Sequence, residues 1–260
     1  MYADNVVILA GGSSERFGSN KLLHKVNGKE MIRRVVEAAS QVGRRVVLSV
    51  RNEGQGEILS KLTGINYIVD LNCSGPMGAV ISAVPRYGRT LILPGDLPWV
   101  DAEVLNEFME LAYKISDSEI HGIIWPSSKV LDSVIVLLNS YEPVLYLKKA
   151  CSLKKTRMTD LHRASRSLTL ISPGLLKEGW RLTDIDRLEE LKQGLTPQQG
   201  KWFTIRQEAL GCPYRSAIDY LSKGDLRRAV ENFELELAMY KDIENLRAHI
   251  VRDIYNLRGS

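Results

Sequence analysis

The sequence predicts an α/β fold in which helices sandwich a mostly parallel sheet, with a small helical appendage after it. Short apolar runs rich in Val and Ile alternate with helical patterns through the first two thirds of the chain, which favours right-handed crossovers and parallel pairing. The runs are apolar on both faces, as is typical of strands buried between two helical layers. We expect strands at residues 6–10, 45–50, 65–70, 90–94, 121–125, 134–138 and 168–171.

Helical patterns fill the segments between these strands. In the clearest of them, Asp101 is placed to cap the first turn, and Val104 and Phe108 recur on one face. We expect helices at residues 31–42, 57–62, 78–84 and 102–113.

The pattern changes near residue 200, where no further strand is expected. Three helical patterns follow, at residues 214–221, 225–240 and 243–257, and residues 195–200 are the expected linker. The sequence therefore predicts a first domain of residues 1–198 and an all-helical domain of residues 199–260. The segment 201–260 holds ten Lys and Arg against nine Asp and Glu, so it has no charged binding stripe. Its apolar spacing suits self-packing and equally suits a protein partner or a second subunit.

The composition of the 260 residues is that of a globular protein, with 44% hydrophobic and 25% charged residues. A formal net charge of +4 suits an anionic small ligand and is too weak to argue for nucleic acid. The N-terminal apolar run is typical of a strand and not of a signal peptide, and no run approaches a membrane span. The three scattered cysteines disfavour a disulfide framework, so we expect Cys73 to be a packing residue and the compartment to be a reducing cytoplasm.

The stretch most informative about function is the loop after the first strand, residues 9–21, LAGGSSERFGSNK. Its glycines let the backbone approach a phosphate closely and point N–H groups at it. Arg16 and Lys21 add mobile positive charge for a polyphosphate. The loop is neither a P-loop nor a dinucleotide fingerprint. The alternative interpretation, a plain turn with two solvated cations, is weakened by the presence of Gly18.

Four motifs occur in an order that resembles one family. The run LAGG-x-x-x-R-F-G-x-x-K resembles the signature loop of the MobA-like nucleotidyltransferases, with Phe17 where that family usually has Met. Asp70 followed by GPMGA at 75–79, then GDLP at 95–98 and DIDRLEEL at 184–191, resemble the family's later motifs. The resemblance implies a Rossmann-like sheet of the nucleotide-diphospho-sugar transferase type and a Mg²⁺-dependent transfer from a nucleoside triphosphate.

The resemblance also implies a role for each matching residue. Arg16, Lys21 and Asp96 would carry catalysis, with Arg16 on the leaving pyrophosphate. The predicted nucleotide-binding residues are Leu9, Ala10, Gly11, Gly12, Lys21, Asn52, Asp70, Gly75, Pro76, Gly78 and Asp96.

The implied metal site consists of Asp96 with Asp184 or Asp186. The late motif departs from the family's Thr-Pro at Arg187 and Leu188, which leaves open which of the two aspartates faces the metal. Each residue also has a structural interpretation: Asp96 as a turn aspartate between two prolines, and either later aspartate as a helix N-cap.

The residue pattern by itself supports a single site at one edge of the sheet. Ligands of open parallel sheets bind outside the carboxyl ends of the strands. The glycine loop, Asn52, Asp70 and Asp96 each follow a predicted strand directly. A carboxylate beside a polyphosphate loop is a reasonable ligand for Mg²⁺, which takes one or two carboxylates plus substrate phosphates. None of the four histidines has metal-ligand spacing, so a zinc site is not expected.

A second feature is the basic segment 147–167, which contains seven Lys or Arg and a single acidic residue, Asp160. One interpretation is a solvated and partly mobile segment. The other is that it borders the pocket and receives an anionic acceptor through Lys154, Lys155 and Arg157.

Together these observations predict a nucleotidyltransferase that uses Mg²⁺ and a nucleoside triphosphate. A phosphate acceptor is already ionised near neutral pH, so alignment and charge neutralisation suffice and no general base is needed. The resemblance favours GTP as donor and molybdopterin as acceptor, giving the guanine dinucleotide form of the molybdenum cofactor. The alternatives are a cytidylyltransferase, a guanylyltransferase for a cobamide precursor, and a non-catalytic nucleotide-binding scaffold that acts through its helical tail.

Overall fold

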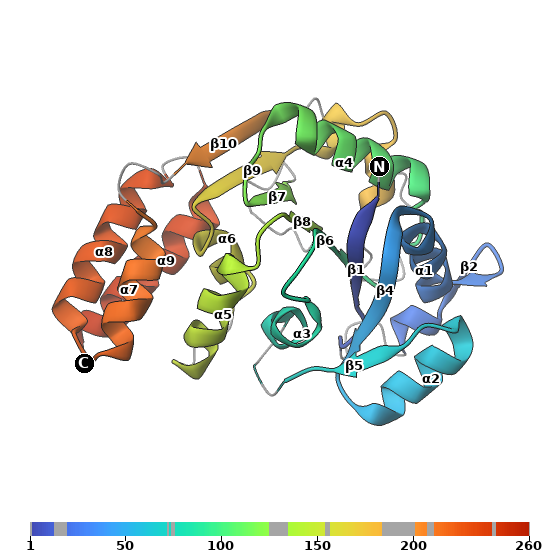
Figure 1. Ribbon diagram of the computed structural model, residues 1–260, viewed down its shortest axis with the longest axis horizontal. Coiled ribbons are helices and arrows are strands. Elements are labelled where there is room, and N and C mark those ends of the chain that lie inside the picture. Colours follow the sequence, from blue (N-terminus) through green and yellow to red (C-terminus); the bar gives the residue numbers. More distant parts are fainter. Residues whose placement is uncertain are drawn as a thin grey trace.

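The chain folds around one large sheet with helices on both faces (Figure 1). The structure, a computed structural model, describes residues 2–12, 20–71, 73, 76–124, 135–153, 157–183, 201–206, 211–240 and 243–259. Within them, eight strands pair in the order β10-β9-β7-β8-β6-β1-β4-β5. They are β1 (Ala3–Leu9), β4 (Gly43–Val50), β5 (Tyr67–Val69), β6 (Thr90–Pro94), β7 (Ile120–Ile123), β8 (Val136–Leu138), β9 (Ser167–Ile171) and β10 (Trp202–Arg206). The predicted α/β fold with a mostly parallel sheet is confirmed.

The direction of the strands places a ligand-binding edge. The strands β5, β4, β1, β6, β7 and β9 run in one direction, and β8 and β10 run against them. In β1, Val7 lies opposite Val47 of β4 and Ile92 of β6. Because the chain continues from β1 to β4 and β5 on one side and returns to β6 on the other, strand order reverses between β1 and β6. Open α/β sheets bind ligands at such a switch point.

Helices cover both faces, and the alternation of side chains along β1 divides the core between them. Val7 belongs to the cluster beneath α3, α5 and the C-terminal helices, whereas Val6 and Ile8 belong to the cluster beneath α1 and α4. The helices before the tail are α1 (Met31–Val42), α2 (Glu53–Thr63), α3 (Pro76–Ala83), α4 (Ala102–Ile115), α5 (Glu142–Ser152) and α6 (Thr159–Arg163). The shorter elements are a β2 (Lys25–Val26) and β3 (Lys29–Glu30) hairpin and the 3₁₀ turns η2 (Lys21–Leu23), η3 (Pro173–Leu175) and η4 (Gly179–Leu182). In the part of the chain described, none of the helices has the length and apolar character needed to cross a membrane.

The sequence predictions succeed where a pattern is local. The helix predicted at 31–42 and the strand predicted at 90–94 have the observed bounds, and Asp101 caps α4 by accepting a hydrogen bond from the Val104 N–H at 3.0 Å. The expectation that no strand follows residue 200 is wrong, because β10 pairs antiparallel with β9. The boundary between the two predicted domains falls outside the described residues, so this division stays a prediction.

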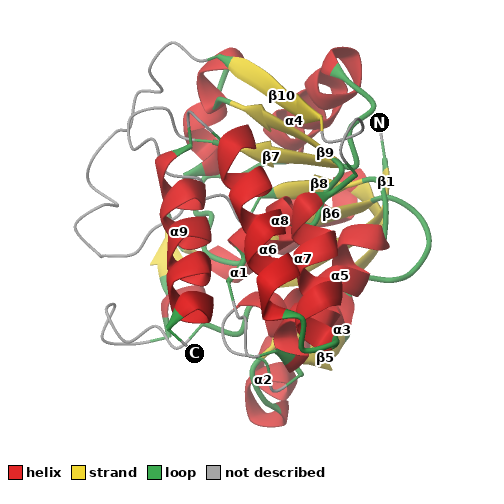
Figure 2. Cartoon of the chain, turned by 90° about the vertical axis from the view of Figure 1, so that its left-hand side faces the viewer, coloured by secondary structure: helices red, strands yellow, loops and turns green. Residues whose placement is uncertain are grey.

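The three C-terminal helices pack on the same core as the sheet. They are α7 (Pro213–Ser222), α8 (Leu226–Met239) and α9 (Glu244–Arg258), and they lie beside α5 and α6 (Figures 1 and 2). Tyr214 of α7 and Phe233 of α8 are fully buried, in one cluster with Leu147 of α5 and Leu161 of α6. The tail therefore covers apolar surface that α5 and α6 would otherwise expose to water.

A buried arginine ties α6 to the tail. The guanidinium of Arg163 donates two hydrogen bonds to Glu236 at 2.7 Å, one to Asp253 at 2.7 Å and one to Asp160 at 2.9 Å. Its carbon lies 4.5 Å from the ring centre of Tyr214. Burial raises the pKa of Glu236, and burial opposes the charge of Arg163, but three facing carboxylates hold the pKa of the guanidinium well above its usual range. One interpretation of residues 147–167 was a solvated segment. Arg163 does not fit that interpretation, because its side chain is buried.

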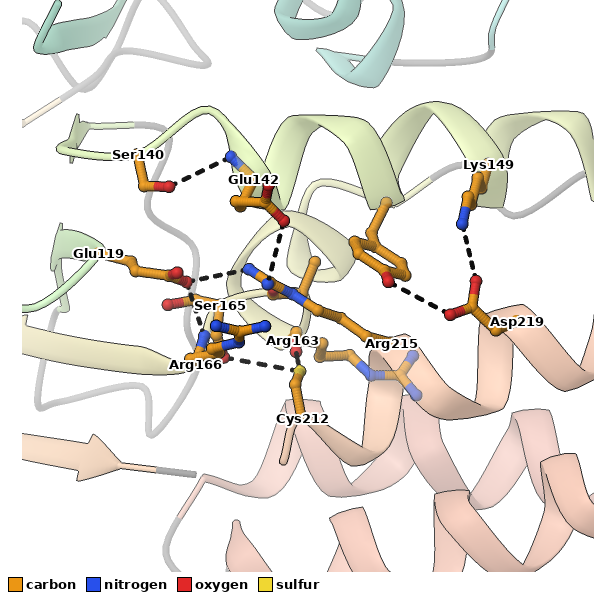
Figure 3. A network of polar contacts seen from close by, with 12 residues as sticks. Glu119, Ser140, Glu142, Lys149, Arg163, Ser165, Arg166, Cys212, Arg215 and Asp219 are labelled. Carbon is orange, nitrogen blue, oxygen red and sulfur yellow. Dashed lines mark hydrogen bonds and ion pairs between the residues drawn. The ribbon is translucent and has the colours of Figure 1, made fainter. Parts of the chain in front are cut away.

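A second group of polar contacts joins α7 to the sheet (Figure 3). Arg215 donates to the Ala164 carbonyl at 2.7 Å and to Glu119 at 3.0 Å, and it lies 3.4 Å from Glu142. Lys149 of α5 pairs with Asp219 of α7 at 2.7 Å. The tail is therefore attached through charged side chains as well as through apolar ones.

We expect Arg163→Met to lower the free energy of unfolding by about 3 to 5 kcal/mol, because it leaves buried carboxylates without their counter-charge. The measurement is equilibrium unfolding in urea. Arg227→Met is the matched control, since that side chain is 90% exposed in its pair with Glu231 and we expect a change within about 0.5 kcal/mol. Equal effects of the two substitutions would contradict the assigned role of Arg163.

Candidate active site

The candidate site lies at the carboxyl ends of β5, β4, β1 and β6, where backbone hydrogen bonds continue past the strands. The Ala10 N–H donates to the Ser49 carbonyl at 2.8 Å, the Gly95 N–H to the Leu9 carbonyl at 2.9 Å, and the Asp70 N–H to the Val50 carbonyl at 2.8 Å. The segments that follow these four strands are thereby held at a single edge. The structure places Gly11, Asn52, Asp70 and Asp96 on these segments, as the sequence predicted.

Lys21 and Asp96 form an ion pair at the switch point. Lys21 begins η2, directly after the glycine-rich loop, and the Asn20 side chain caps this turn by accepting from the Leu22 N–H at 3.2 Å. Asp96 follows β6. Both side chains are largely buried, with 15% of Lys21 and 11% of Asp96 exposed. Two residues that the sequence assigns to phosphate and to metal are therefore in contact.

Leu22 packs against Gly95, the residue before Asp96. A Cβ on Gly95 would lie 3.1 Å from the Leu22 side chain and 3.1 Å from the Leu9 carbonyl. The absence of a side chain at residue 95 thus brings η2 close to the end of β1 and places Lys21 beside Asp96.

Asp70 supports the glycine-rich loop from the side. One of its carboxylate oxygens accepts a hydrogen bond from the Ser49 hydroxyl, and the other lies 2.7 Å from the position that a Cβ on Gly11 would occupy. Burial raises the pKa of Asp70, and the Ser49 hydrogen bond partly offsets this effect. Asp70 therefore lies where the sequence predicted, with Gly11 in direct contact.

Gly78 at the start of α3 shows the same close approach. A Cβ there would lie 2.5 Å from the Leu71 carbonyl and 2.8 Å from the Cys73 carbonyl. The glycine lets α3 lie against the loop that follows Asp70. Pro76 begins α3, and Gly75 lies outside the described residues.

Asn52 has a role that the motif comparison did not predict. Its side-chain oxygen accepts from the Gln55 N–H at 2.9 Å and so caps α2. Gln55, which sequence reasoning missed, donates from its side-chain nitrogen to the Ala10 carbonyl at 2.7 Å. The spacing Asn-x-x-Gln is that of a capping box, and this signal predicts the start of a helix at residue 53 instead of 57.

The described residues suit a metal that arrives with substrate phosphates. Asp96 contributes a single buried carboxylate at this edge, already facing a cation, and Mg²⁺ commonly takes one or two carboxylates plus phosphate oxygens. Within the described part of the chain, no group of three or more His, Cys, Asp or Glu is arranged to hold a metal. Asp96 therefore fits a metal that is held in part by substrate phosphates.

The segment that leads to the later aspartates is attached beside the Asp96 loop. Arg181 of η4 pairs with Asp101, and the Trp99 and Trp180 rings lie 5.9 Å apart. Asp101 and Trp99 belong to the loop between Asp96 and α4. Asp184 and Asp186 themselves lie outside the described residues, as do Arg16, Lys154 and Lys155.

Arg157 is the described member of the predicted acceptor-binding residues. It is half-buried, and its backbone N–H donates to Asp160 at 3.3 Å. The acceptor role stays a prediction.

Cys73 and Cys151 form a disulfide, so the expectation against one is wrong. Cys73 lies in the loop between Asp70 and α3, and Cys151 lies in the last turn of α5, with their Cα atoms 6.1 Å apart. The two cysteines are 78 residues apart in sequence, so no spacing motif pairs them. The bond joins the loop before α3 to the helix that precedes Lys154, and the cytoplasmic location stays a prediction.

Gly11 and Gly12 follow β1, and the Lys21–Asp96 pair lies at the switch point of a mostly parallel sheet, where open α/β sheets bind their ligands. Residues 6–169 match the family model of the MobA-like NTP transferase domain. Because this match covers more than half of the chain, the chain belongs to the MobA-like NTP transferase family and is a nucleotidyltransferase by family.

Individual relatives cover the chain in part. A probable molybdenum cofactor guanylyltransferase of Thermococcus sibiricus is 31% identical over 105 residues, which are 40% of this chain and 53% of that protein. The bifunctional protein GlmU of Neisseria meningitidis serogroup B is 33% identical over 114 residues, which are 42% of this chain and 25% of that protein. The chain thus spans about half of the first relative and a quarter of the second.

Solved structures show the same fold. Molybdopterin-guanine dinucleotide biosynthesis protein A from Archaeoglobus fulgidus superposes with a TM-score of 0.61 at 21% identity, covering 72% of this chain and 95% of that one. A 4-diphosphocytidyl-2C-methyl-D-erythritol synthase from Anaerococcus prevotii superposes with a TM-score of 0.52 at 11% identity, covering 74% of this chain and 93% of that one.

We expect Gly11→Ala to destabilise the chain by about 1 to 3 kcal/mol, because its methyl group would overlap Asp70. Gly12→Ala is the matched control, since among the described residues, chain neighbours aside, no atom lies within 4 Å of the position of its added Cβ. Thermal unfolding of both variants checks this, and equal melting temperatures would contradict the close approach.

We expect reduction of the Cys73–Cys151 bond to lower the free energy of unfolding by about 2 to 5 kcal/mol, because the bond closes a long loop in the unfolded chain. Urea unfolding with and without a dithiol reductant measures the difference. Cys151→Ser should abolish the difference, whereas Cys212→Ser, at the buried free cysteine, should keep it. A wild-type chain indifferent to reductant would contradict the prediction.

Proposed function

We propose that this chain transfers a nucleoside monophosphate from a nucleoside triphosphate, with GTP favoured, to a phosphorylated acceptor, with molybdopterin favoured, and releases pyrophosphate. The observation that carries the proposal is the Lys21–Asp96 pair at the switch point, at the same sheet edge as Gly11 and Gly12. It supplies a cation for phosphates and a carboxylate for a divalent metal at the edge where the fold binds ligands.

The proposed chemistry assigns each residue a task that its position permits. The N–H groups of the glycine-rich loop bind phosphate oxygens, and Lys21 neutralises their charge. Asp96 would hold Mg²⁺, which would supply positive charge against the charge that develops on the phosphates during transfer. An acceptor phosphate needs no deprotonation, since its second pKa lies near 6. Alignment of the two substrates by the site is then the main contribution of the protein.

The Lys21–Asp96 ion pair links the binding of nucleotide to the binding of metal in this proposal. In the nucleotide-free chain each neutralises the other, which offsets the cost of burying both charges. When a metal–triphosphate complex binds, Lys21 would pair with a phosphate and Asp96 would be available to hold the metal, so each charge would keep a partner of opposite sign. Nucleotide and metal should therefore bind better together than either does alone.

The choice of GTP and molybdopterin rests on the sequence motifs and on the relative from Thermococcus sibiricus. The similarity to GlmU supports nucleotidyl transfer to another phosphorylated acceptor as the second candidate. A thermal-shift panel of GTP, CTP, ATP and UTP with Mg²⁺ separates the bases, since the ligand that binds selectively raises the melting temperature. A protein that binds nucleotide and releases no pyrophosphate with any acceptor would instead be a scaffold.

We expect Asp96→Asn to lower the rate of pyrophosphate release by about a hundredfold or more, because the metal loses its carboxylate ligand. Nucleotide affinity, measured by calorimetry, should fall only modestly, since the loop and Lys21 remain. Glu103→Gln, at an exposed carboxylate on α4, is the control and should leave both values unchanged. Full activity of Asp96→Asn would refute the metal role.

A further inference from the structure

We propose that Gln55 is a positioning residue of the nucleotide site, an inference that rests on the proposed function. Gln55 lies in the first turn of α2, and its side-chain amide joins two loops at the sheet edge. The side-chain oxygen accepts from the Arg51 N–H at 3.0 Å, and the side-chain nitrogen donates to the Ala10 carbonyl at 2.7 Å. One planar group therefore fixes the segment after β4 relative to the segment after β1.

The two contacts differ in what they require of residue 55. Accepting a backbone hydrogen bond at the start of α2, here from Arg51, the residue before the N-cap, resembles the task of Glu or Gln at the third position of a capping box and needs only a side-chain oxygen. Either residue can perform it, and a negative charge near a helix N-terminus is favourable. Donating to the Ala10 carbonyl is different, because an ionised glutamate has no proton to give. The contact with Arg51 could thus be made by Glu or Gln at residue 55. The contact with the Ala10 carbonyl needs a donor and therefore requires Gln.

The Ala10 carbonyl belongs to the same peptide unit as the Gly11 N–H. The peptide is planar and trans, so the C=O and N–H groups of one unit point in opposite directions. Gln55 holds the carbonyl end of this unit toward α2, which fixes the direction of the Gly11 N–H at the other end. Asp70 confines Gly11 from the side, at 2.7 Å from its Cβ position. The two contacts together orient the first donor of the phosphate-binding loop before any ligand arrives.

Asn52 contributes to the same arrangement through Gln55. It accepts from the Gln55 N–H at 2.9 Å and so fixes the first turn of α2. Among the described contacts the Asn52 side chain binds the Gln55 backbone, and the Gln55 side chain binds the Ala10 carbonyl.

The test is the substitution Gln55→Glu, which keeps the capping acceptor and the side-chain shape but removes the donor at neutral pH. We expect the affinity for the Mg²⁺ complex of GTP, measured by calorimetry, to fall about tenfold at pH 7.5, the effect of one lost hydrogen bond. As the pH is lowered toward 5, the ratio of variant to wild-type affinity should recover, because a protonated carboxyl again donates to the Ala10 carbonyl. A merely structural role in capping α2 would give no such recovery.

Two further variants serve as comparisons for Gln55→Glu. Gln55→Leu loses both contacts, and its affinity deficit should not change with pH relative to wild type. Gln41→Glu is the matched control, since Gln41 is an exposed glutamine that donates to the Glu37 carbonyl within α1, and it should bind as wild type does. A Gln55→Glu chain that binds normally at pH 7.5, or whose deficit is independent of pH, would overturn the proposal.

Amide hydrogen exchange of the ligand-free chain separates this inference from the proposed function. The Gly11 N–H should exchange faster in Gln55→Glu than in wild type at pH 7.5, and the ratio of the two rates should approach one as the pH falls. Failure of the wild-type chain to bind any nucleoside triphosphate with Mg²⁺ would refute the proposed function, while the exchange ratio would still decide whether Gln55 orients the loop. An exchange ratio of one at pH 7.5 would refute the positioning role.

Discussion

Parallel pairing of β1 with β4 on one side and β6 on the other is the constraint on which the rest of the structure depends. It brings the ends of three strands to one edge, and the hydrogen bonds from Ala10 to Ser49 and from Gly95 to Leu9 carry the pairing into the loops. Asp96 is placed by its attachment to β6, and the glycine-rich loop by its attachment to β1. The chemistry of the site thus follows from strand register more than from loop sequence.

Much of the fold could be predicted because its information is local. Buried Val- and Ile-rich runs identify β1, β4 and β6, and periodicity together with a capping aspartate identifies α4. The same reasoning failed where long-range contacts decide the structure. β10 is short and pairs with β9 across a long separation, and the last turns of α5 lie inside the segment 147–167, whose lysines suggested a solvated chain. One interpretation counted Arg163 among solvated cations, because two of its three carboxylate partners, Glu236 and Asp253, lie far along the chain in α8 and α9.

The site shows the same division. Motif order and strand-end position were enough to place Gly11, Asp70 and Asp96 at one edge. The contact between Lys21 and Asp96 was not predictable, because it depends on the packing of Leu22 in η2 against Gly95. The resemblance placed Asn52 near the nucleotide, which stays a prediction; its side chain caps α2, and Gln55 makes the contact with the Ala10 carbonyl after β1. The Cys73–Cys151 bond lay beyond sequence reasoning, since α3 and α5 meet only in the folded chain.

The buried guanidinium of Arg163 restricts which segments can be recombined. Glu236 and Asp253, two of its three acidic partners, belong to the C-terminal helices, and so does the aromatic face of Tyr214. A chimera that joins this nucleotide-binding half to helices from another relative would strand the positive charge in an apolar setting, unless residue 163 were exchanged along with them. In this chain the first segment and the C-terminal helices are therefore exchangeable only as one unit, because the charge of Arg163 is balanced by carboxylates from both.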